Sequence, residues 1–145
     1  MTGVQTCALP ICFPVTIAGV YMERAFAPKS DMEEKLRNDN IPLFTLETKT
    51  PLRELDAIGF SLSYEMTYTN VLNMLDLAGI PIERKDRGED FPIVMAGGTG
   101  AYNPKVLSEY VDAFMMGEGE EVIREVAELL KENKALSRNE KLNNE

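Results

Sequence analysis

Three short polar segments hold the residue types that could bind a small molecule. They span residues 61–65, 97–103 and 117–121, and each follows a short apolar run and precedes a stretch with helical spacing. In an open sheet of parallel strands, the carboxyl ends of the strands share one edge, where ligands bind. The glycines allow a positive φ and the close approach of a ligand, and each following helix offers unpaired N–H donors. The candidate binding residues are Ser61, Ser63, Tyr64, Glu65, Gly97, Gly98, Thr99, Gly117, Glu118, Gly119 and Glu120.

Two alternatives to ligand binding remain open at these segments. A tight turn alone explains any single one of the glycines, whereas their coincidence on one edge favours contact with a ligand or with another domain. The carboxylates of Glu118, Glu120 and Glu121 suit a helix N-terminus, whose macrodipole they offset, better than general acid–base catalysis. They would also repel a phosphate group at that position. We therefore assign no catalytic residue and no metal ligand to this chain.

The composition excludes several classes of function. The chain has 145 residues and no histidine, so it cannot form a Ser/His/Asp triad, a Cys/His pair or a histidine proton shuttle. Its net charge of −9 disfavours binding to nucleic acid or to an anionic lipid surface. A membrane span needs about 20 consecutive apolar residues, and the sequence has no such run. Both cysteines, Cys7 and Cys12, lie close to the N-terminus, which predicts a reduced, cytoplasmic protein.

Short apolar runs alternate with amphipathic stretches, which predicts an α/β domain with a mostly parallel sheet. The predicted strands are residues 20–27, 41–47, 57–63, 91–96 and 113–116. The predicted helices are residues 30–38, with Ser30 and Glu33 as a capping box, a helix between Thr67 or Thr69 and Gly79, a short helix at Pro104, and the longest one after Glu120. The polar tail after Lys134 is expected to be a linker that is disordered when isolated.

Six segments of the sequence resemble one known family. They are residues 22–28 (MERAFAP), 41–47 (IPLFTLE), 59–65 (GFSLSYE), 68–81 (YTNVLNMLDLAGIP), 96–98 (AGG) and 117–121 (GEGEE). In this order they are similar to radical SAM proteins that carry an N-terminal cobalamin-binding-like domain, specifically to a class with a divergent version of that domain. The similarity spans almost the whole body of the chain, from Val20 to about Leu142.

The resemblance implies a flavodoxin-like fold of the cobalamin-binding type, with strand order 2-1-3-4-5, that precedes a radical SAM barrel. The barrel would hold a [4Fe-4S] cluster through a C-x-x-x-C-x-x-C motif and would cleave S-adenosylmethionine. This chain has no such motif, so we expect it to bind no cluster and to be inactive alone. The implied partners are the barrel, within the same polypeptide, and a corrin. Because the D-x-H-x-x-G motif of many cobalamin domains is absent, cobalamin would bind without a protein histidine.

The first eleven residues (MTGVQTCALPI) show neither a helical nor an alternating period and resemble the translation of a sequencing adapter. We expect a leader at residues 1–19, artefactual at 1–11, the cobalamin-binding-like domain at 20–134, and a linker towards the barrel at 135–145. The first strand and its helix should precede Val20, so we expect the sheet to lack them. Such a loss would leave backbone groups unpaired and destabilise the domain, unless residues 13–19 supply a substitute strand.

Two functions of different classes follow from the sequence. The first is a noncatalytic N-terminal domain of a radical SAM enzyme, whose glycine-rich edge faces a corrin or the barrel. The alternative is a stand-alone flavodoxin-like module that binds a nucleotide or another small ligand. A receiver-like signalling domain is disfavoured, because no pair of acids after the first strand is available for a phosphoacceptor pocket.

Overall fold

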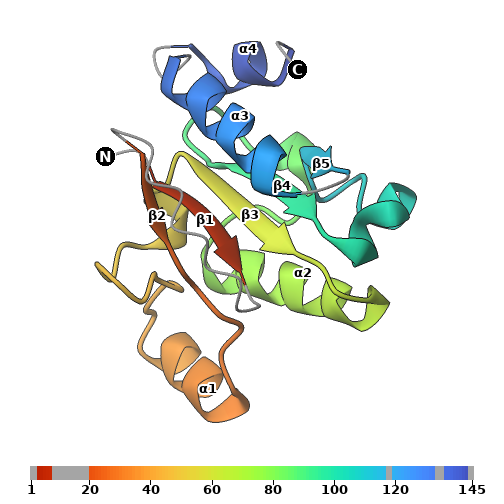
Figure 1. The fold of residues 1–145 in the computed structure, drawn as a ribbon. Helices are drawn as coiled ribbons and strands as arrows, with labels where there is room; N and C mark the ends of the chain where they lie inside the picture. The colour runs from red at the N-terminus through yellow and green to blue at the C-terminus, as the bar shows by residue number, and fades with distance from the viewer. Residues whose placement is uncertain (1–2, 8–19, 117–118, 133–135, 144–145) are drawn as a thin grey trace.

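Five parallel strands form one open sheet in the order β2-β1-β3-β4-β5 (Figure 1). The structure, a computed structural model, describes residues 3–7, 20–116, 119–132 and 136–143. The strands are β1 (Gly3–Cys7), β2 (Tyr21–Glu23), β3 (Ala57–Ser61), β4 (Ile93–Gly97) and β5 (Ala113–Met115). This topology confirms the expected flavodoxin-like open α/β fold.

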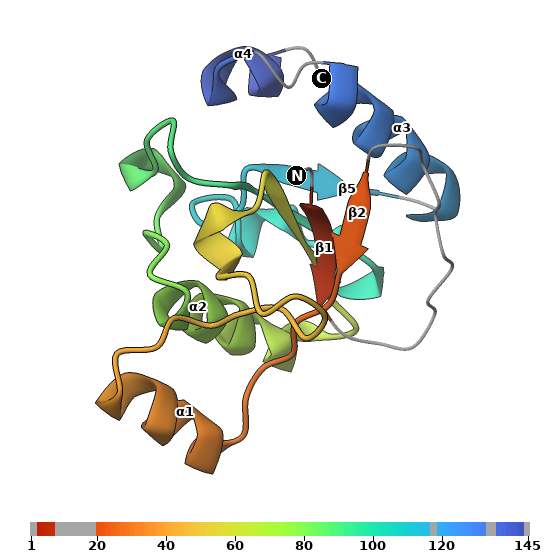
Figure 2. The same ribbon diagram turned by 90° about the vertical axis from the view of Figure 1, so that its left-hand side faces the viewer.

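Helices cover both faces of the sheet, with α2 and α3 on opposite sides (Figure 2). The α-helices are α1 (Ser30–Asn38), α2 (Tyr68–Leu77), α3 (Gly119–Glu132) and α4 (Arg138–Asn143). Single 3-10 turns lie at Leu52–Glu54, Glu65–Thr67, Arg84–Asp86, Thr99–Tyr102 and Pro104–Val106. The predicted helix over residues 30–38 is confirmed, and so is the helix that follows Thr67.

The central strands β3 and β4 contribute alternate side chains to two separate cores. The core on the side of α2 includes Ile58, Phe60, Val94, Ala96, Val71, Met74 and Leu75. The core on the side of α3 includes Ala57, Ile93, Met95, Ala127 and Leu130. Successive side chains of a strand point to opposite faces, so a strand covered on both faces is apolar at every position. This arrangement explains the unbroken apolar runs in the sequence.

The sheet does not lack its first strand, contrary to the expectation from the sequence. Residues Gly3–Cys7 form β1 inside the sheet, where Val4 pairs with Met22 of β2 and with Ala57 of β3. Strand pairing uses backbone N–H and C=O groups, so it does not require the alternating side-chain pattern that these residues lack. Residues 13–19, which the sequence offers as a substitute strand, lie outside the described residues.

Residues 41–47 do not form the predicted second strand, because residues Tyr21–Glu23 occupy that position beside β1. Their backbone groups bond instead within a local loop and to α2. Phe44 and Pro51 form an isolated antiparallel bridge, and the N–H of Leu43 donates to the carbonyl of Leu77 over 2.9 Å. The segment is apolar because Leu43 packs in the core on the side of α2, not because it extends the sheet.

The polar tail contains a helix, α4, where the sequence predicts disorder, and its role as a linker towards the barrel stays a prediction. Two reciprocal hydrogen bonds begin α4: the N–H of Ser137 donates to Glu140 Oε2 over 2.9 Å, and the N–H of Glu140 donates to Ser137 Oγ over 3.3 Å. This is a capping box, which satisfies two backbone donors that a helix start leaves free. The box predicted at Ser30 and Glu33 does not form, since no side chain caps α1.

Candidate functional site

Two of the three predicted binding segments meet at the carboxyl edge of the sheet. Ser61 and Gly97 are register partners at the ends of β3 and β4. Beyond them, the N–H of Leu62 donates to the carbonyl of Gly97, and the N–H of Gly100 donates to the carbonyl of Leu62, each over 2.8 Å. The hydroxyl of Thr99 donates to the carbonyl of Ser63 over 2.8 Å. The two loops are therefore joined into one hydrogen-bonded unit.

The glycines of the second loop allow its close contact with the first. Gly98 has a φ of +94°, and a Cβ atom there would lie 2.6 Å from the carbonyl oxygen of Leu62. A Cβ at Gly100 would lie 3.0 Å from the Cβ of Leu62 and 3.2 Å from the nitrogen of Tyr64. At both positions, the atoms that make a side chain unfavourable are neighbouring protein atoms. The structure thus gives these glycines a role in loop packing, and contact of the same loops with a ligand stays a prediction.

The side chains of this unit differ in their access to solvent. Ser61, Tyr64, Glu65, Gly98 and Thr99 are exposed, Ser63 is half-buried and Gly97 is buried. Tyr68 at the start of α2 bonds to the unit as well: its hydroxyl donates to the carbonyl of Gly100 over 2.6 Å. The exposed members are therefore accessible to a ligand or to another domain.

The third predicted segment follows β5, which pairs with β4 and ends at the same edge. Gly117 and Glu118 lie outside the described residues, so their predicted role is untested. Gly119 and Glu120 begin α3, the longest helix of the described residues. Of these four residues, the structure shows only that the backbone of Gly119 and Glu120 starts α3.

The described residues contain no group of three or more Cys, His, Asp or Glu side chains that could hold a metal ion. The chain has only two cysteines, fewer than a [4Fe-4S] cluster uses, and no histidine for an axial cobalt ligand. The residues of this chain therefore do not fit a cluster. In the same described part, no helix is both long enough and apolar enough to cross a membrane.

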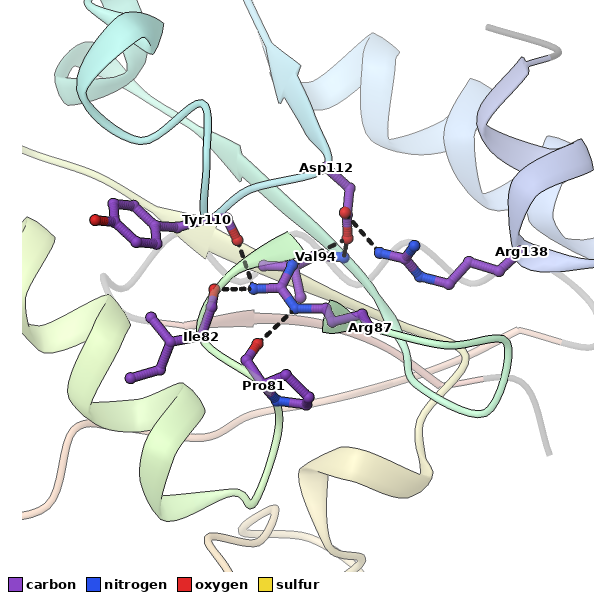
Figure 3. Close-up of polar contacts among 7 residues, drawn as sticks. All are labelled: Pro81, Ile82, Arg87, Val94, Tyr110, Asp112 and Arg138. Atoms are coloured by element: carbon purple, nitrogen blue, oxygen red, sulfur yellow. Dashed lines mark hydrogen bonds and ion pairs between the residues drawn. The ribbon is translucent and has the colours of Figure 1, made fainter. Parts of the chain in front are cut away.

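A buried polar network that the sequence does not predict lies at the other end of the sheet (Figure 3). Asp112, just before β5, accepts hydrogen bonds from the N–H of Val94 over 2.8 Å and from Arg87 Nη1 over 3.2 Å. Its other oxygen, Oδ1, lies 2.6 Å from Nη2 of Arg138. The side chains of Arg87, Asp112 and Arg138 are only 0%, 2% and 7% exposed.

Arg87 also joins its own loop to two other segments of the chain, at residues 81–82 and at Tyr110. Its guanidinium donates to the carbonyls of Pro81 over 2.8 Å, Ile82 over 2.7 Å and Tyr110 over 2.6 Å. Burial lowers the pKa of Arg87, because desolvation disfavours the charged form, and the carboxylate of Asp112 opposes that shift. In the sequence, Arg87 is one basic residue in a charged loop, and nothing in its local pattern predicts burial.

The comparisons with known proteins identify the family of this chain. The family model described as "Radical SAM proteins, N-terminal" matches residues 16–144. No curated protein and no solved structure matches the chain. The matched range includes the strands from β2 to β5, all four helices and the predicted segments, and it begins after β1. The chain therefore belongs to the family of N-terminal domains of radical SAM proteins.

Proposed function

We propose that this chain is the noncatalytic N-terminal domain of a radical SAM enzyme and that its carboxyl edge packs against the catalytic barrel. The family match is the observation that supports this function. The full-length protein would hold the [4Fe-4S] cluster and S-adenosylmethionine in the barrel, because this chain lacks the cysteines for a cluster. Such a protein belongs in the reducing cytoplasm.

The carboxyl edge has the side chains expected of a domain interface. Large apolar side chains are exposed on the segments that follow three neighbouring strands: Tyr64 and Met66 after β3, Tyr102 and Val106 after β4, and Met116 after β5. Between half and four fifths of each of these side chains is accessible, with values from 50% to 78%. Exposed aromatic and methionine side chains at one edge are typical of a surface that another protein surface covers.

Cobalamin is a further candidate ligand at the same edge. The joined loops leave no glycine cradle open next to Leu62, and the chain has no histidine to coordinate cobalt. A corrin would therefore rest on exposed side chains such as Tyr64 and Tyr102, without a cobalt bond to this domain. We infer that the barrel interface is the main function of this edge and that corrin binding is subordinate to it.

The decisive experiment is long-read sequencing of the source locus across both ends of the coding region. An in-frame C-x-x-x-C-x-x-C motif downstream of Glu145 would support the proposal. A stop codon directly after Glu145 would contradict it and favour the alternative of a stand-alone binding module. Titration of the purified chain with hydroxocobalamin, followed by its visible absorption, tests the corrin separately. Saturable spectral change that Tyr64→Ala weakens, but an exposed control substitution such as Met32→Ala does not, would support corrin contact at this edge.

A further inference from the structure

A cleft opens at the amino-terminal edge of the sheet, opposite the joined loops. It has a volume of about 490 Å³, within the range of about 300–1,000 Å³ that is usual for small-molecule sites. Its walls come from the segment before β3, the segment before β4 and the segment that begins α4. The polar lining residues are Arg53, Glu54, Asp56, Glu89, Asp90, Ser137 and Arg138.

Two polar groups that line this cleft are buried without a hydrogen-bond partner among the described residues. One is Oδ2 of Asp56, and the other is the Nε–H of Arg138. The Nη2 of Arg138 lies close to Asp112 but is not aligned to donate a hydrogen bond to it. Buried polar groups of native proteins are nearly always hydrogen-bonded. An acceptor and a donor in one cleft are therefore available to an external partner that has both functions.

The charges around the cleft define that partner. Arg87 and Arg138 share the single carboxylate of Asp112, so this buried group of three carries a net charge of +1. Glu89 accepts a hydrogen bond from the backbone N–H of Arg138, not from its guanidinium. An anionic group beside Arg138 would balance the remaining charge, as in bidentate binding of carboxylates by arginine.

The lining also carries acidic side chains. Glu54, Asp56 and Asp90 are among them, and Arg53 is the only basic residue of the lining besides Arg138. A cationic group suits these carboxylates, and the broad χ2 torsion of an aspartate lets Oδ2 of Asp56 turn towards it. We propose that the cleft binds a small zwitterion of the α-amino-acid class, with its carboxylate on Arg138 and its ammonium group on Asp56.

This site is separate from the proposed barrel interface, since it lies at the other end of the strands. The test is an NMR titration of the 145-residue chain, labelled with ¹⁵N, against each standard L-amino acid. Acetate and ethylamine, titrated in parallel, represent the two halves of the zwitterion. We expect at least one amino acid to cause saturable shifts of the backbone amides at residues 53–56, 89–91 and 136–138, and each half to bind at least tenfold more weakly.

Asp56→Asn should weaken that binding at least tenfold, because the amide keeps the shape of the side chain and loses its charge. The matched control is Asp39→Asn, at an exposed position after α1, which should bind as the parent chain does. Thermal unfolding of both variants verifies that the fold is intact. The proposal is wrong if no amino acid causes saturable shifts up to about 10 mM, where a millimolar site would fill. Equal binding of acetate, or unchanged binding by Asp56→Asn, would overturn it as well.

Discussion

Asp112 and Arg138 join the last helix of the domain to its sheet. Oδ1 of Asp112 lies 2.6 Å from Nη2 of Arg138, and both side chains are almost fully buried. Asp112 directly precedes β5, and Arg138 is the first residue of α4. Helix α4 is therefore packed against the sheet through this buried ion pair.

Asp112→Asn should strongly destabilise the domain. The substitution keeps the size of the side chain but leaves two buried guanidinium groups without their shared carboxylate. Removal of one partner from a buried ion pair costs about 3–5 kcal/mol. Urea denaturation measures this loss as a lower free energy of unfolding. Asp39→Asn, at an exposed position, should stay within about 0.5 kcal/mol of the parent chain. Equal stability of the two variants would show that Asp112 is not the centre of the network.

Replacement of Arg87 should lower the free energy of unfolding more than replacement of Arg138. Arg87→Met removes the partner of three backbone carbonyls and of Asp112, so we expect a loss of about 3–5 kcal/mol. Arg138→Met leaves a neutral pair of Arg87 and Asp112, and we expect a loss below about 1.5 kcal/mol, as for apolar replacements of buried ions. Parallel urea titrations of the two variants measure the difference. A larger loss for Arg138→Met than for Arg87→Met would contradict the roles assigned here.

Gly98→Ala should destabilise the joined loops. Its φ of +94° is unfavourable for a side chain, and the new Cβ would lie 2.6 Å from a backbone oxygen. Strain and overpacking together predict a loss of roughly 2–4 kcal/mol. Gly88→Ala is the matched control, because no atom lies within 4 Å of its Cβ position and its φ is not positive. Thermal unfolding should show the control unchanged or slightly stabilised. A similar melting temperature for both variants would contradict the packing role of Gly98.

Glu47 should make the stability of the domain sensitive to acid. Partial burial raises the pKa of Glu47, but hydrogen bonds from the backbone N–H and the guanidinium of Arg24 outweigh burial, and the pKa is lowered from 4.5. The folded state therefore binds this proton less tightly than the unfolded state. The stabilisation is complete above pH 4.5 and is lost as the pH falls through the lower pKa of the folded state.

Urea denaturation of Glu47→Gln and of the parent chain, between neutral pH and about pH 3, measures this effect. The difference in unfolding free energy should be largest at neutral pH and should shrink towards the acid end. Glu34→Gln, at an exposed position in α1, reports the general effect of removing one surface carboxylate. A difference that is constant across the range would contradict the role of Glu47.

The sequence predicted the fold where burial determines the local pattern. β3 and β4 are apolar at consecutive positions because both of their faces are covered, and that pattern is visible without a structure. Residues 41–47 are also rich in apolar residues but lie in a loop, where Leu43 is buried by packing on α2. Composition reports burial, and it does not distinguish a strand from a buried loop.

The two capping boxes show how tertiary contacts override a local motif. Glu33 does not cap α1, because its carboxylate accepts hydrogen bonds from Arg37 over 3.1 Å and from Asn73 of α2 over 3.0 Å. Ser137 and Glu140 have the same spacing and do form a box, which the sequence analysis overlooked in a polar tail. The motif could have predicted α4. The buried network of Arg87 and Asp112 had no comparable signal, because its partners are distant in the chain.

The proximity of the candidate loops could be predicted, but their mode of contact could not. Parallel strand order alone brings Ser61 and Gly97 to one edge. The joining of the loops depends on backbone bonds to Leu62, an apolar residue that no chemical motif would select. The structure gives Gly98 a role in packing against Leu62, which is one of the two alternatives that the sequence leaves open, and ligand binding by the glycines stays a prediction.

Gln5→Pro tests the position of β1, the strand that the sequence analysis did not expect. Gln5 pairs with Glu23 on one side and with Ile58 on the other, so β1 is an internal strand. Proline removes a backbone donor and is excluded from the middle of a sheet, which predicts a loss of about 3 kcal/mol or more in unfolding free energy. Gln5→Ala keeps the donor and serves as the control. Urea denaturation of both variants should show a large loss for proline and a much smaller one for alanine. If proline is tolerated as well as alanine, β1 does not hold the sheet together, and the interpretation of residues 1–11 as an adapter-derived leader gains support.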